Sequence, residues 1–364
     1  MRPARVRPPR WDPFHRSCAV DPSDSVAQTV DGTGKRVPGK DRAQLRIIHG
    51  LQEALAAGLE KPVCTVGFFD GVHRGHSLVL EDLRNWAQEI EGTPTVITFD
   101  RHPKGIIGAG DPIPITPLEE RLERLAGERV EVTILLPFDE ELSRWSPERF
   151  IEEALVGAVG CRHLLMGFDS AFGAGARGTA EYLKSLPSLA VELRESRPVE
   201  VDGEPVSSTA IRKAVISGEL DRAASLLGRP YGLRAPVISG ERRGQMIGFP
   251  TANLDPGFVL VPPVGVYLGL ARRQGKIWPA AINIGRRPTF GGEEAAEGTP
   301  FDPRLDRFEA HLVGFDGDLY GVILEVEMHR FLRGEKRFDG VKELCQQIKL
   351  DLEDLDRWWR SREG

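Results

Sequence analysis

The sequence of 364 residues has few cysteines, no long apolar run and no excess of basic residues. Its four cysteines, Cys18, Cys64, Cys161 and Cys345, stand far apart without a CxxC pair, so they indicate neither a disulfide framework nor a zinc site and fit a reducing cytoplasm. No apolar run approaches the roughly 18 residues of a membrane helix, and no signal-peptide core is present. The formal net charge of −6 argues against binding nucleic acid through a broad basic surface. Small-molecule substrates are therefore favoured over nucleic-acid or membrane partners, while the oligomeric state is left open.

The first 44 residues differ in composition from the rest of the chain. Six prolines stand there among scattered charges, with almost no periodic apolar pattern. This composition predicts a disordered N-terminal extension. Several early arginines resemble those of a targeting peptide, but the prolines and Asp12 would spoil an amphipathic helix, so a tail or an upstream start codon is favoured.

Between residues 45 and 228, short apolar runs alternate with segments of helical spacing. Strands are predicted at 64–68, 95–99, 132–137, 163–167 and 190–195, and helices at 77–91, 117–126, 147–159 and 179–185. A helical bridge follows at 208–227. The alternation predicts an α/β domain with a doubly wound parallel sheet, and ligands of such sheets bind at the carboxyl ends of the strands.

From residue 229 to 364 the pattern changes to strand-like runs separated by Gly, Pro and Asp turns, without long helices between them. These runs lie at 236–239, 264–272, 276–284, 307–313 and 322–328. Their spacing predicts an antiparallel β-barrel. A final segment, 341–359, has helical apolar spacing and is expected to pack against that barrel. The sequence therefore predicts two domains of different class.

The most informative motif for chemistry is TVGFFDGVHRGHS at 65–77, where an apolar strand enters a glycine turn and a helix begins. His73 and His76 lie three residues apart beside the predicted helix N-terminus, whose free N–H groups favour a phosphate. Two imidazoles there could donate hydrogen bonds to the α-phosphate of a nucleoside triphosphate during in-line attack. A lone HxxH is commonly structural, but this position between strand and helix favours a phosphate site.

A second segment, at 206–212, opens a predicted helix with hydroxyl groups and a guanidinium. Ser207, Ser208, Thr209 and Arg212 could hold a leaving pyrophosphate, although the segment alone is also an ordinary N-cap sequence. Together with the histidine turn it becomes informative.

A competing motif is GAGARG at 173–178, a formal GxGxxG that follows a predicted strand. It raises the alternative of a nicotinamide-dependent oxidoreductase. Residues 168–172 separate the strand from the glycines, so the tight strand–turn–helix geometry of a dinucleotide fingerprint is missing, and no Walker A sequence is present. We therefore discount this alternative.

In the predicted barrel, the segment GERRGQMIGFPTAN at 240–253 carries the candidate phosphate and metal residues. Gly244 and Gly248 would let backbone amides approach a phosphate, and the side-chain oxygens of Thr251 and Asn253 suit magnesium, although a plain turn is the alternative. Glu309, in RFEAH, could take a proton from a primary alcohol, although one acid on one strand is more often simply solvated.

Nine motifs occur in the order found in the bacterial bifunctional riboflavin kinase and FAD synthetase family: GFFDGVHRGH, TFDRHP, GFDSAFG, SSTAIR, GFPTAN, NIGRRPTF, FEAHL, DLYG and FLRGEKRF. The sequence resembles this family from about residue 46 to the C-terminus. The resemblance implies an N-terminal FMN adenylyltransferase domain of nucleotidyltransferase fold and a C-terminal riboflavin kinase barrel. It also implies two reactions, riboflavin to FMN and FMN to FAD, each consuming one ATP with Mg²⁺.

The same resemblance implies roles for single residues. His73 and His76 would steady the α-phosphate of ATP, while Ser207, Ser208, Thr209 and Arg212 would face the triphosphate. Thr251 and Asn253 would hold magnesium and nucleotide, and Glu309 would activate the ribityl hydroxyl of riboflavin. Asp169 and Arg333 would lie near the flavin. The other expected phosphate-binding residues belong to the two glycine loops: Gly67, Phe68, Phe69, Asp70, Gly244, Gly248, Phe249 and Pro250.

The departures from the family pattern fall mostly in one loop. Ser170 and Ala171 replace a Phe-Arg pair, Ala176 stands where arginine is common, and Thr179 replaces an aspartate. An aromatic and up to two cationic contacts would then be absent from the adenylyltransferase half. Two alternatives to the bifunctional enzyme therefore stay open: a riboflavin kinase with a degenerate first domain, and a flavin- or nucleotide-binding regulator.

Overall fold

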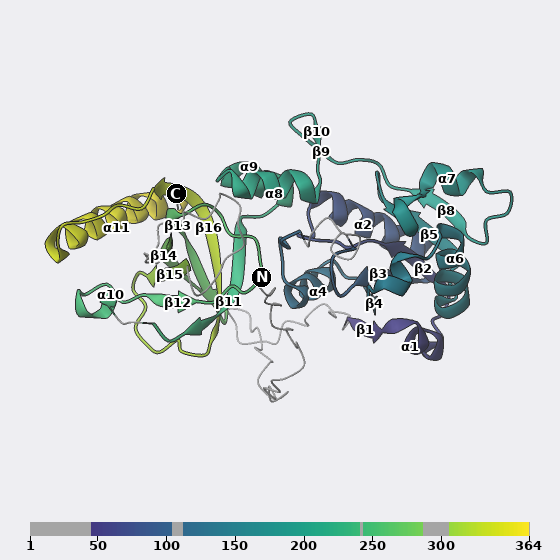
Figure 1. The fold of residues 1–364 in the computed structure, drawn as a ribbon, viewed down its shortest axis with the longest axis horizontal. Helices are drawn as coiled ribbons and strands as arrows, with labels where there is room; N and C mark the ends of the chain where they lie inside the picture. The colour runs from purple at the N-terminus through teal and green to yellow at the C-terminus, as the bar shows by residue number, and fades with distance from the viewer. Residues whose placement is uncertain (1–44, 104–111, 241–242, 287–305, 364) are drawn as a thin grey trace, which may run out of the picture. The chain divides into compact units, whose positions relative to one another are not determined.

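The computed structural model describes residues 45–103, 112–240, 243–286 and 306–363. The predicted N-terminal extension, 1–44, lies outside the described residues, as does the end of the NIGRRPTF motif. The chain forms a six-stranded parallel sheet followed by a closed six-stranded antiparallel barrel and a terminal helix, which confirms the predicted fold class (Figure 1). Within the described residues, no helix has both the length and the apolar character needed to cross a membrane.

The parallel sheet has the strand order β1-β4-β3-β2-β5-β8. Its strands are β1 (Arg46–His49), β2 (Pro62–Val66), β3 (Thr93–Phe99), β4 (Val132–Leu136), β5 (His163–Met166) and β8 (Glu192–Glu195). Five of these were predicted. The edge strand β1 was not predicted.

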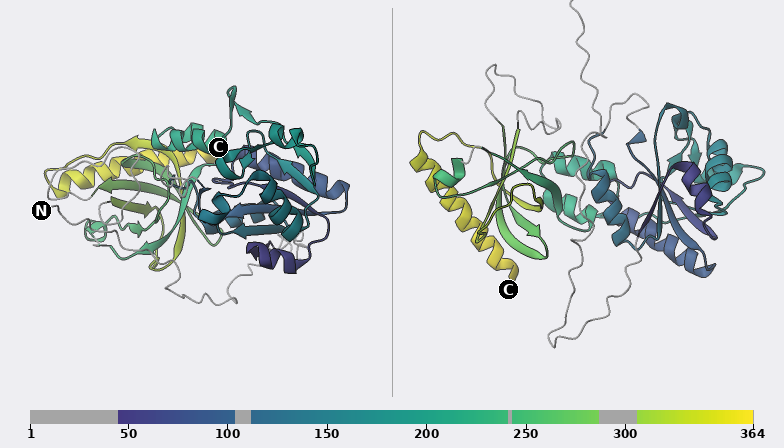
Figure 2. Two further views of the ribbon diagram at one scale, coloured as in Figure 1. Left: turned by 45° about the vertical axis from the view of Figure 1, so that its right-hand side comes forward. Right: turned by 90° about the horizontal axis from the view of Figure 1, so that it is seen from below.

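Helices cover both faces of this sheet, as its continuous apolar strands require. Neighbouring strand residues belong to different cores: Val63 and Val96 pack with α2 (Arg74–Glu89) and α4 (Leu118–Gly127), whereas Cys64 and Ile97 pack on the opposite face. That opposite face is covered by α1 (Gly50–Ala57), the π-helical segment Phe150–Val159 and α7 (Ala180–Ser185) (Figure 2). The sheet is therefore doubly wound.

Several short elements lie in the connections around the sheet. They are α5 (Glu140–Ser143), α6 (Pro147–Arg149), the pair β6 (Ala171–Phe172) and β7 (Gly178–Thr179), and the pair β9 (Glu200–Val201) and β10 (Glu204–Pro205). The predicted helical bridge is two helices, α8 (Ser208–Ile216) and α9 (Leu220–Leu227).

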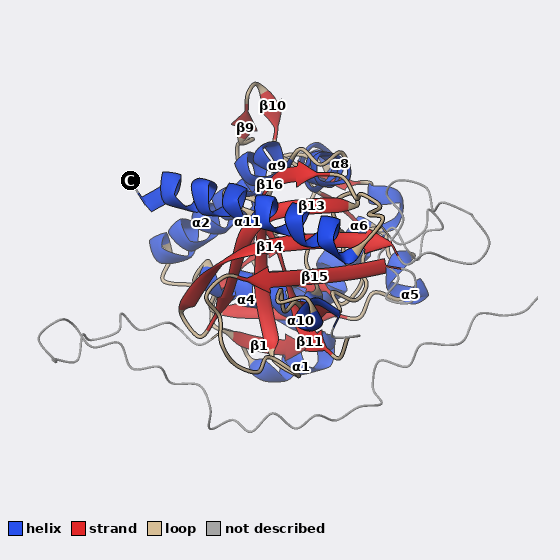
Figure 3. Cartoon of the chain, turned by 90° about the vertical axis from the view of Figure 1, so that its left-hand side faces the viewer, coloured by secondary structure: helices blue, strands red, loops and turns tan. Residues whose placement is uncertain are grey.

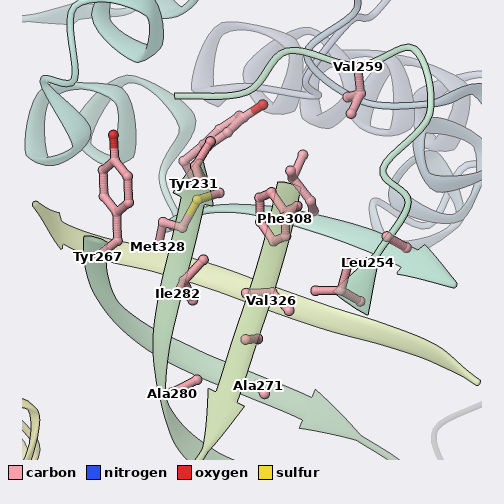
Figure 4. Close-up of a cluster of buried hydrophobic side chains, with 14 of the residues drawn as sticks. Tyr231, Leu254, Val259, Tyr267, Ala271, Ala280, Ile282, Phe308, Val326 and Met328 are labelled. Carbon is pink, nitrogen blue, oxygen red and sulfur yellow. The ribbon is translucent and has the colours of Figure 1, made fainter. Parts of the chain in front are cut away.

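The barrel closes in the order β11-β12-β15-β14-β13-β16. Its strands are β11 (Tyr231–Ile238), β12 (Ala252–Leu254), β13 (Gly265–Arg273), β14 (Lys276–Arg286), β15 (Asp306–Leu312) and β16 (Ile323–Arg333). The three-residue strand β12 was not predicted. Side chains such as Tyr231, Ile282, Phe308 and Val326 fill the interior (Figure 4).

The terminal helix α11 (Val341–Glu363) contacts β13 and β14 on the outside of the barrel (Figure 3). A single turn, α10 (Arg243–Met246), precedes β12. Along β15, burial alternates: Phe308, Ala310 and Leu312 are buried, while Arg307, Glu309 and His311 are partly exposed. Because strand side chains alternate between faces, these three polar residues point away from the barrel core.

Candidate active sites

The histidine turn lies at the carboxyl end of β2, in the middle of the parallel sheet. From β2 the chain winds through β3 to β4, next to the edge strand β1, and then crosses to β5 and β8 on the opposite side of β2. The direction of winding therefore reverses between β2 and β5. In open α/β sheets this reversal is the place where ligands bind, because the loops on either side diverge there.

Positive φ angles give the turn its tight path. Phe69, Gly71 and Val72 have φ of 57°, 82° and 39°. Such angles are unfavourable for L-residues, most of all for a β-branched valine, and persist only where surrounding contacts hold them. Two hydroxyl groups supply such contacts, since Thr98 Oγ1 donates to Phe68 O at 3.2 Å and Ser208 Oγ to Asp70 O at 3.0 Å.

Asp70 anchors the turn to distant parts of the chain. Its side chain is 2% exposed and accepts hydrogen bonds from the backbone N–H groups of Ile115 at 3.0 Å and Thr116 at 3.1 Å. It also forms an ion pair with Arg212, with 2.5 Å between Nη2 and Oδ2. The Asp70 carboxylate is thus occupied inside the protein, and these contacts fit a positioning residue better than the predicted phosphate contact.

The two histidines cap the start of α2 reciprocally. His73 is the N-cap residue, and its Nδ1 accepts from His76 N at 3.3 Å, while His76 Nδ1 accepts from His73 N at 3.4 Å. The two rings stack with centroids 3.6 Å apart. An Nδ1 that accepts an N–H bond carries no proton, so each neutral ring bears its proton on Nε2 and offers that N–H as a donor.

Both histidines are kept neutral near pH 7. Burial, together with the nearby guanidinium groups of Arg229 and Arg212, lowers the pKa of His73 to about 4. Burial also holds the pKa of His76 well below the usual value, with smaller contributions from His73 and Arg121. Neutral Nε2–H groups at a helix N-terminus are hydrogen-bond donors of the kind that suits an anionic phosphate.

The structure brings the segment 207–212 to the histidine turn, as predicted, through the contacts of Asp70 with Ser208 and Arg212. Ser207 is the N-cap of α8, since its Oγ accepts from Ala210 N at 3.2 Å. Arg212 Nε donates to Ile113 O at 3.0 Å. Thr209 is exposed. Ser207 is thus an ordinary helix N-cap, whereas Ser208 and Arg212 support the histidine turn through Asp70.

The glycine motif at 173–178 joins β6 to the start of β7 through a single 3-10 turn, Ala174–Ala176, and not through the strand–turn–α-helix of a dinucleotide fingerprint. A Cβ at Gly173 would lie 2.7 Å from Pro147 N, so this glycine allows close packing. Thr179 caps α7 by accepting from Tyr182 N, and Ala171 and Ala176 are exposed. The exposed Asp169 has a φ of 61° in the turn after β5. The structure supports our rejection of the dinucleotide-binding interpretation.

Arg121 is a member of this region that the sequence analysis did not identify. It is 1% exposed, its guanidinium lies 3.9 Å from the centroid of the Phe68 ring, and it donates to Phe99 O. Burial lowers its pKa to about 10, which still leaves it charged. The His102 ring lies 4.5 Å from Phe68. Nothing in the sequence distinguished Arg121 from the other charged residues of its helix. His102, in contrast, belongs to the TFDRHP motif.

The second site is a pocket of about 370 Å³ on the outside of the barrel, beside α11. It collects most of the residues predicted for the kinase site, together with Asn283 and Asp351, which were not predicted. The predicted residues that line it are Gly244, Phe249, Thr251, Asn253, Glu309 and Arg333. Gly248, with a φ of 87°, and Pro250 belong to the same loop but do not line this pocket.

Strand register places three side chains of this pocket side by side. Glu309 on β15 is paired with Asn253 on β12 and with Asn283 on β14. Directly opposed residues of antiparallel strands carry their side chains on the same face, about 5 Å apart at Cβ. The carboxylate of Glu309 is therefore flanked by two amides. Asn283 begins the NIGRRPTF motif, which was the only sequence signal for it.

Two glycines make room for the polar residues of the pocket. A Cβ at Gly240 would overlap the Asn253 amide, and one at Gly244 would overlap Phe249 O and lie 3.4 Å from Thr251 Oγ1. His311 Nδ1 lies 2.7 Å from Pro250 O and ties the loop to β15. The glycine loop thus lies directly against the strand residues.

Arg333 ends β16 and forms a bidentate ion pair with Asp351 of α11. Its Nη2 lies 2.7 Å from Asp351 Oδ2, and its Nε lies 2.9 Å from Oδ1. Asp351 is buried. This pair holds α11 at the rim of the pocket. Arg333 therefore lines the pocket, where the flavin is predicted to bind, with its guanidinium held by the Asp351 carboxylate.

The chain joins a doubly wound sheet, with two buried histidines at its switch point, to a barrel with a carboxylate-bearing pocket. This arrangement is typical of an enzyme with two separate sites. Comparison with known proteins agrees. The family model for FAD synthetase matches residues 56–210, and the model for riboflavin kinase matches residues 227–359.

Known relatives match more than four-fifths of the chain. The bifunctional riboflavin kinase/FMN adenylyltransferase of Bacillus subtilis is 34% identical over 83% of this chain and 93% of its own length. The protein of the same name from Escherichia coli K12 is 32% identical over 84% and 96%. A crystal structure described as a macrolide-efflux protein from Streptococcus pneumoniae superposes with a TM-score of 0.73 at 30% identity, over 86% of this chain and 99% of that one. The chain belongs to the bifunctional riboflavin kinase/FMN adenylyltransferase family, which confirms the resemblance noted from its motifs.

Proposed function

We propose that this protein phosphorylates riboflavin to FMN in the barrel pocket and adenylylates FMN to FAD at the histidine turn. The observation that carries this proposal is that each of the two sites lies within a different family-model match. His73 and His76 lie within residues 56–210, and Glu309 with its flanking asparagines lies within residues 227–359. Both models match, which favours the bifunctional enzyme over a kinase with a degenerate first domain.

In the kinase reaction, Glu309 acts as general base. Its carboxylate accepts the proton of the primary ribityl hydroxyl as that oxygen attacks the γ-phosphorus of ATP. A new O–P bond forms, the bond from the γ-phosphorus to the bridging oxygen breaks, and ADP leaves. Asn253 and Asn283 flank the carboxylate in the strand register and orient it toward the substrate.

The residues present fit a magnesium ion in this pocket. Thr251 and Asn253 supply hard oxygen atoms, and Gly240 leaves the space that the Asn253 amide occupies. Among the described residues no group of three or more His, Cys, Asp or Glu side chains could hold a metal. Mg²⁺ commonly takes one or two protein ligands and completes its coordination with substrate phosphates and water, so Thr251 and Asn253 would suffice. When bound, the ion would neutralise charge on the phosphates of ATP.

In the adenylyl transfer, a phosphate oxygen of FMN attacks the α-phosphorus of ATP and pyrophosphate leaves. FMN is already anionic, so no protein base is required. The Nε2–H groups of His73 and His76 donate to the α-phosphate as its charge grows, at the N-terminus of α2. Arg121, buried beside Phe68, adds positive charge to this region.

The direct test separates the flavins formed from riboflavin, ATP and Mg²⁺ by the purified protein. Formation of FMN followed by FAD supports the proposal. FMN alone would favour the kinase with a degenerate first domain, and unchanged riboflavin would favour a binding protein. The cytoplasm is the proposed location, supported by the free cysteines Cys64, Cys161 and Cys345 in the described part of the chain.

A further inference from the structure

Arg229 contacts the histidine turn from a distant part of the sequence. It follows α9 and precedes β11, yet its Nη1 donates to Val72 O at 3.0 Å and its Nη2 donates to Gly71 O at 2.5 Å. These two carbonyls directly precede His73, the N-cap of α2. One planar guanidinium thus fixes two successive peptide groups at the point where the chain enters the catalytic helix.

The turn needs this support. Gly71 and Val72 both have positive φ, and Val72 at 39° is the more strained of the two. Thr98 holds the carbonyl of Phe68, Val72 N holds that of Phe69, and Ser208 holds that of Asp70. Arg229 completes the set, so that every carbonyl from residue 68 to residue 72 has a donor.

We propose that Arg229 is a positioning residue for adenylyl transfer, which holds the 71–72 peptide groups so that the His73 ring presents its Nε2–H in a fixed direction. The inference rests on the proposed role of the histidine turn. The cation also acts on the ring electrostatically. His73 faces the stacked ring of His76 and the guanidinium groups of Arg229 and Arg212, and both arginines oppose its protonation.

Arg229 lies in the part of the chain that matches the other activity. The FAD synthetase match ends at residue 210, and Arg229 lies inside the riboflavin kinase match, 227–359. The adenylyl transfer site therefore draws a supporting residue from the segment that the family models assign to the other reaction.

The test uses the full chain with Arg229→Ala and Arg229→Lys. We expect kcat for FMN to FAD to fall about tenfold to a hundredfold in the alanine variant, with little change in KM for ATP, because misplacement of a catalytic group costs rate more than binding. Riboflavin phosphorylation should stay at the wild-type rate. Lysine keeps the charge but cannot donate to both carbonyls as a planar fork, so it should restore only part of the rate.

A titration of His73 by NMR separates the charge of Arg229 from its hydrogen bonds, because lysine keeps the charge and alanine does not. Its pKa should rise in Arg229→Ala and stay low in Arg229→Lys. Arg234→Ala is the matched control, since Arg234 lies in the same segment and forms an exposed ion pair with Glu123. Both activities should be unchanged in it.

Each outcome decides between clear alternatives. A wild-type protein that forms no FAD would refute the proposed function itself. If the wild type forms FAD and the folded alanine variant does so equally fast, the positioning role is wrong. A raised KM with unchanged kcat would make Arg229 a ligand contact instead. Should the alanine variant fail to fold, Arg229→Lys decides, and full activity with lysine would overturn the inference.

Discussion

The two sites of this chain are built by different structural means. The histidine turn is an irregular backbone segment held by side chains from remote positions, among them Thr98, Ser208, Arg212 and Arg229. The barrel pocket is placed by strand register, which sets Glu309 between two asparagines without irregular backbone in β15.

This difference predicts different kinds of fragility. A turn held by many distant contacts loses its geometry when any one support is removed, including supports that never touch the substrate. A site placed by register depends chiefly on the side chains that line it, because the strands stay paired when one side chain is changed. Variants in each site should therefore affect one reaction and spare the other.

The largest effect is expected for Glu309→Gln. Glutamine keeps the size of the side chain but cannot accept the ribityl proton, so riboflavin phosphorylation should fall about 10²- to 10⁴-fold. Adenylylation of added FMN should continue at the wild-type rate. Separate assays from riboflavin and from FMN check both statements. Loss of both reactions in a folded variant would contradict the separation of the sites.

His76→Ala should give the reciprocal result with a somewhat smaller loss. It removes one Nε2–H donor and the reciprocal cap of His73, so FAD formation should fall about 10²- to 10³-fold. Riboflavin phosphorylation serves as the internal control and should be unaffected. An unchanged rate of FAD formation would mean that the stacked histidines are only a helix cap.

Gly240→Ala tests whether register alone secures the barrel site. The added methyl group overlaps the Asn253 amide, which is the end of a flexible side chain and can turn aside. We expect the protein to remain folded while riboflavin phosphorylation falls about tenfold to a hundredfold, because displacing the Asn253 amide, a proposed magnesium ligand, lowers the rate of the reaction. Gly127→Ala is the control, since nothing lies within 4 Å of its Cβ position. Equal activity in both variants would show that the position of the Asn253 amide is unimportant.

Much of the fold and of the two candidate sites could be predicted from the sequence, and the features that could not be predicted share a physical cause. The HxxH turn and the strands around it were recognisable because their patterns are local. The three-residue strand β12 is too short for a periodic signal. The role of Asp70 depends on Ile115, Thr116 and Arg212, and that of Arg229 on carbonyls far earlier in the chain. Such partners are set by the tertiary fold, so no local pattern reveals them.

The smallest expected effect concerns the pH dependence of stability and arises at the histidine turn. Burial, with help from Arg229 and Arg212, lowers the pKa of His73 from the usual 6.5 to about 4. The folded protein therefore binds fewer protons at His73 than the unfolded chain between these values, and the free energy of unfolding must fall as the pH drops through that range. Between pH 7 and pH 5 the loss from His73 should be on the order of 1 to 2 kcal/mol. Urea unfolding at both pH values, for the wild type and for His73→Gln, measures it. The glutamine variant should lose less stability on acidification than the wild type, and an identical loss in both proteins would show that His73 titrates normally in the folded state.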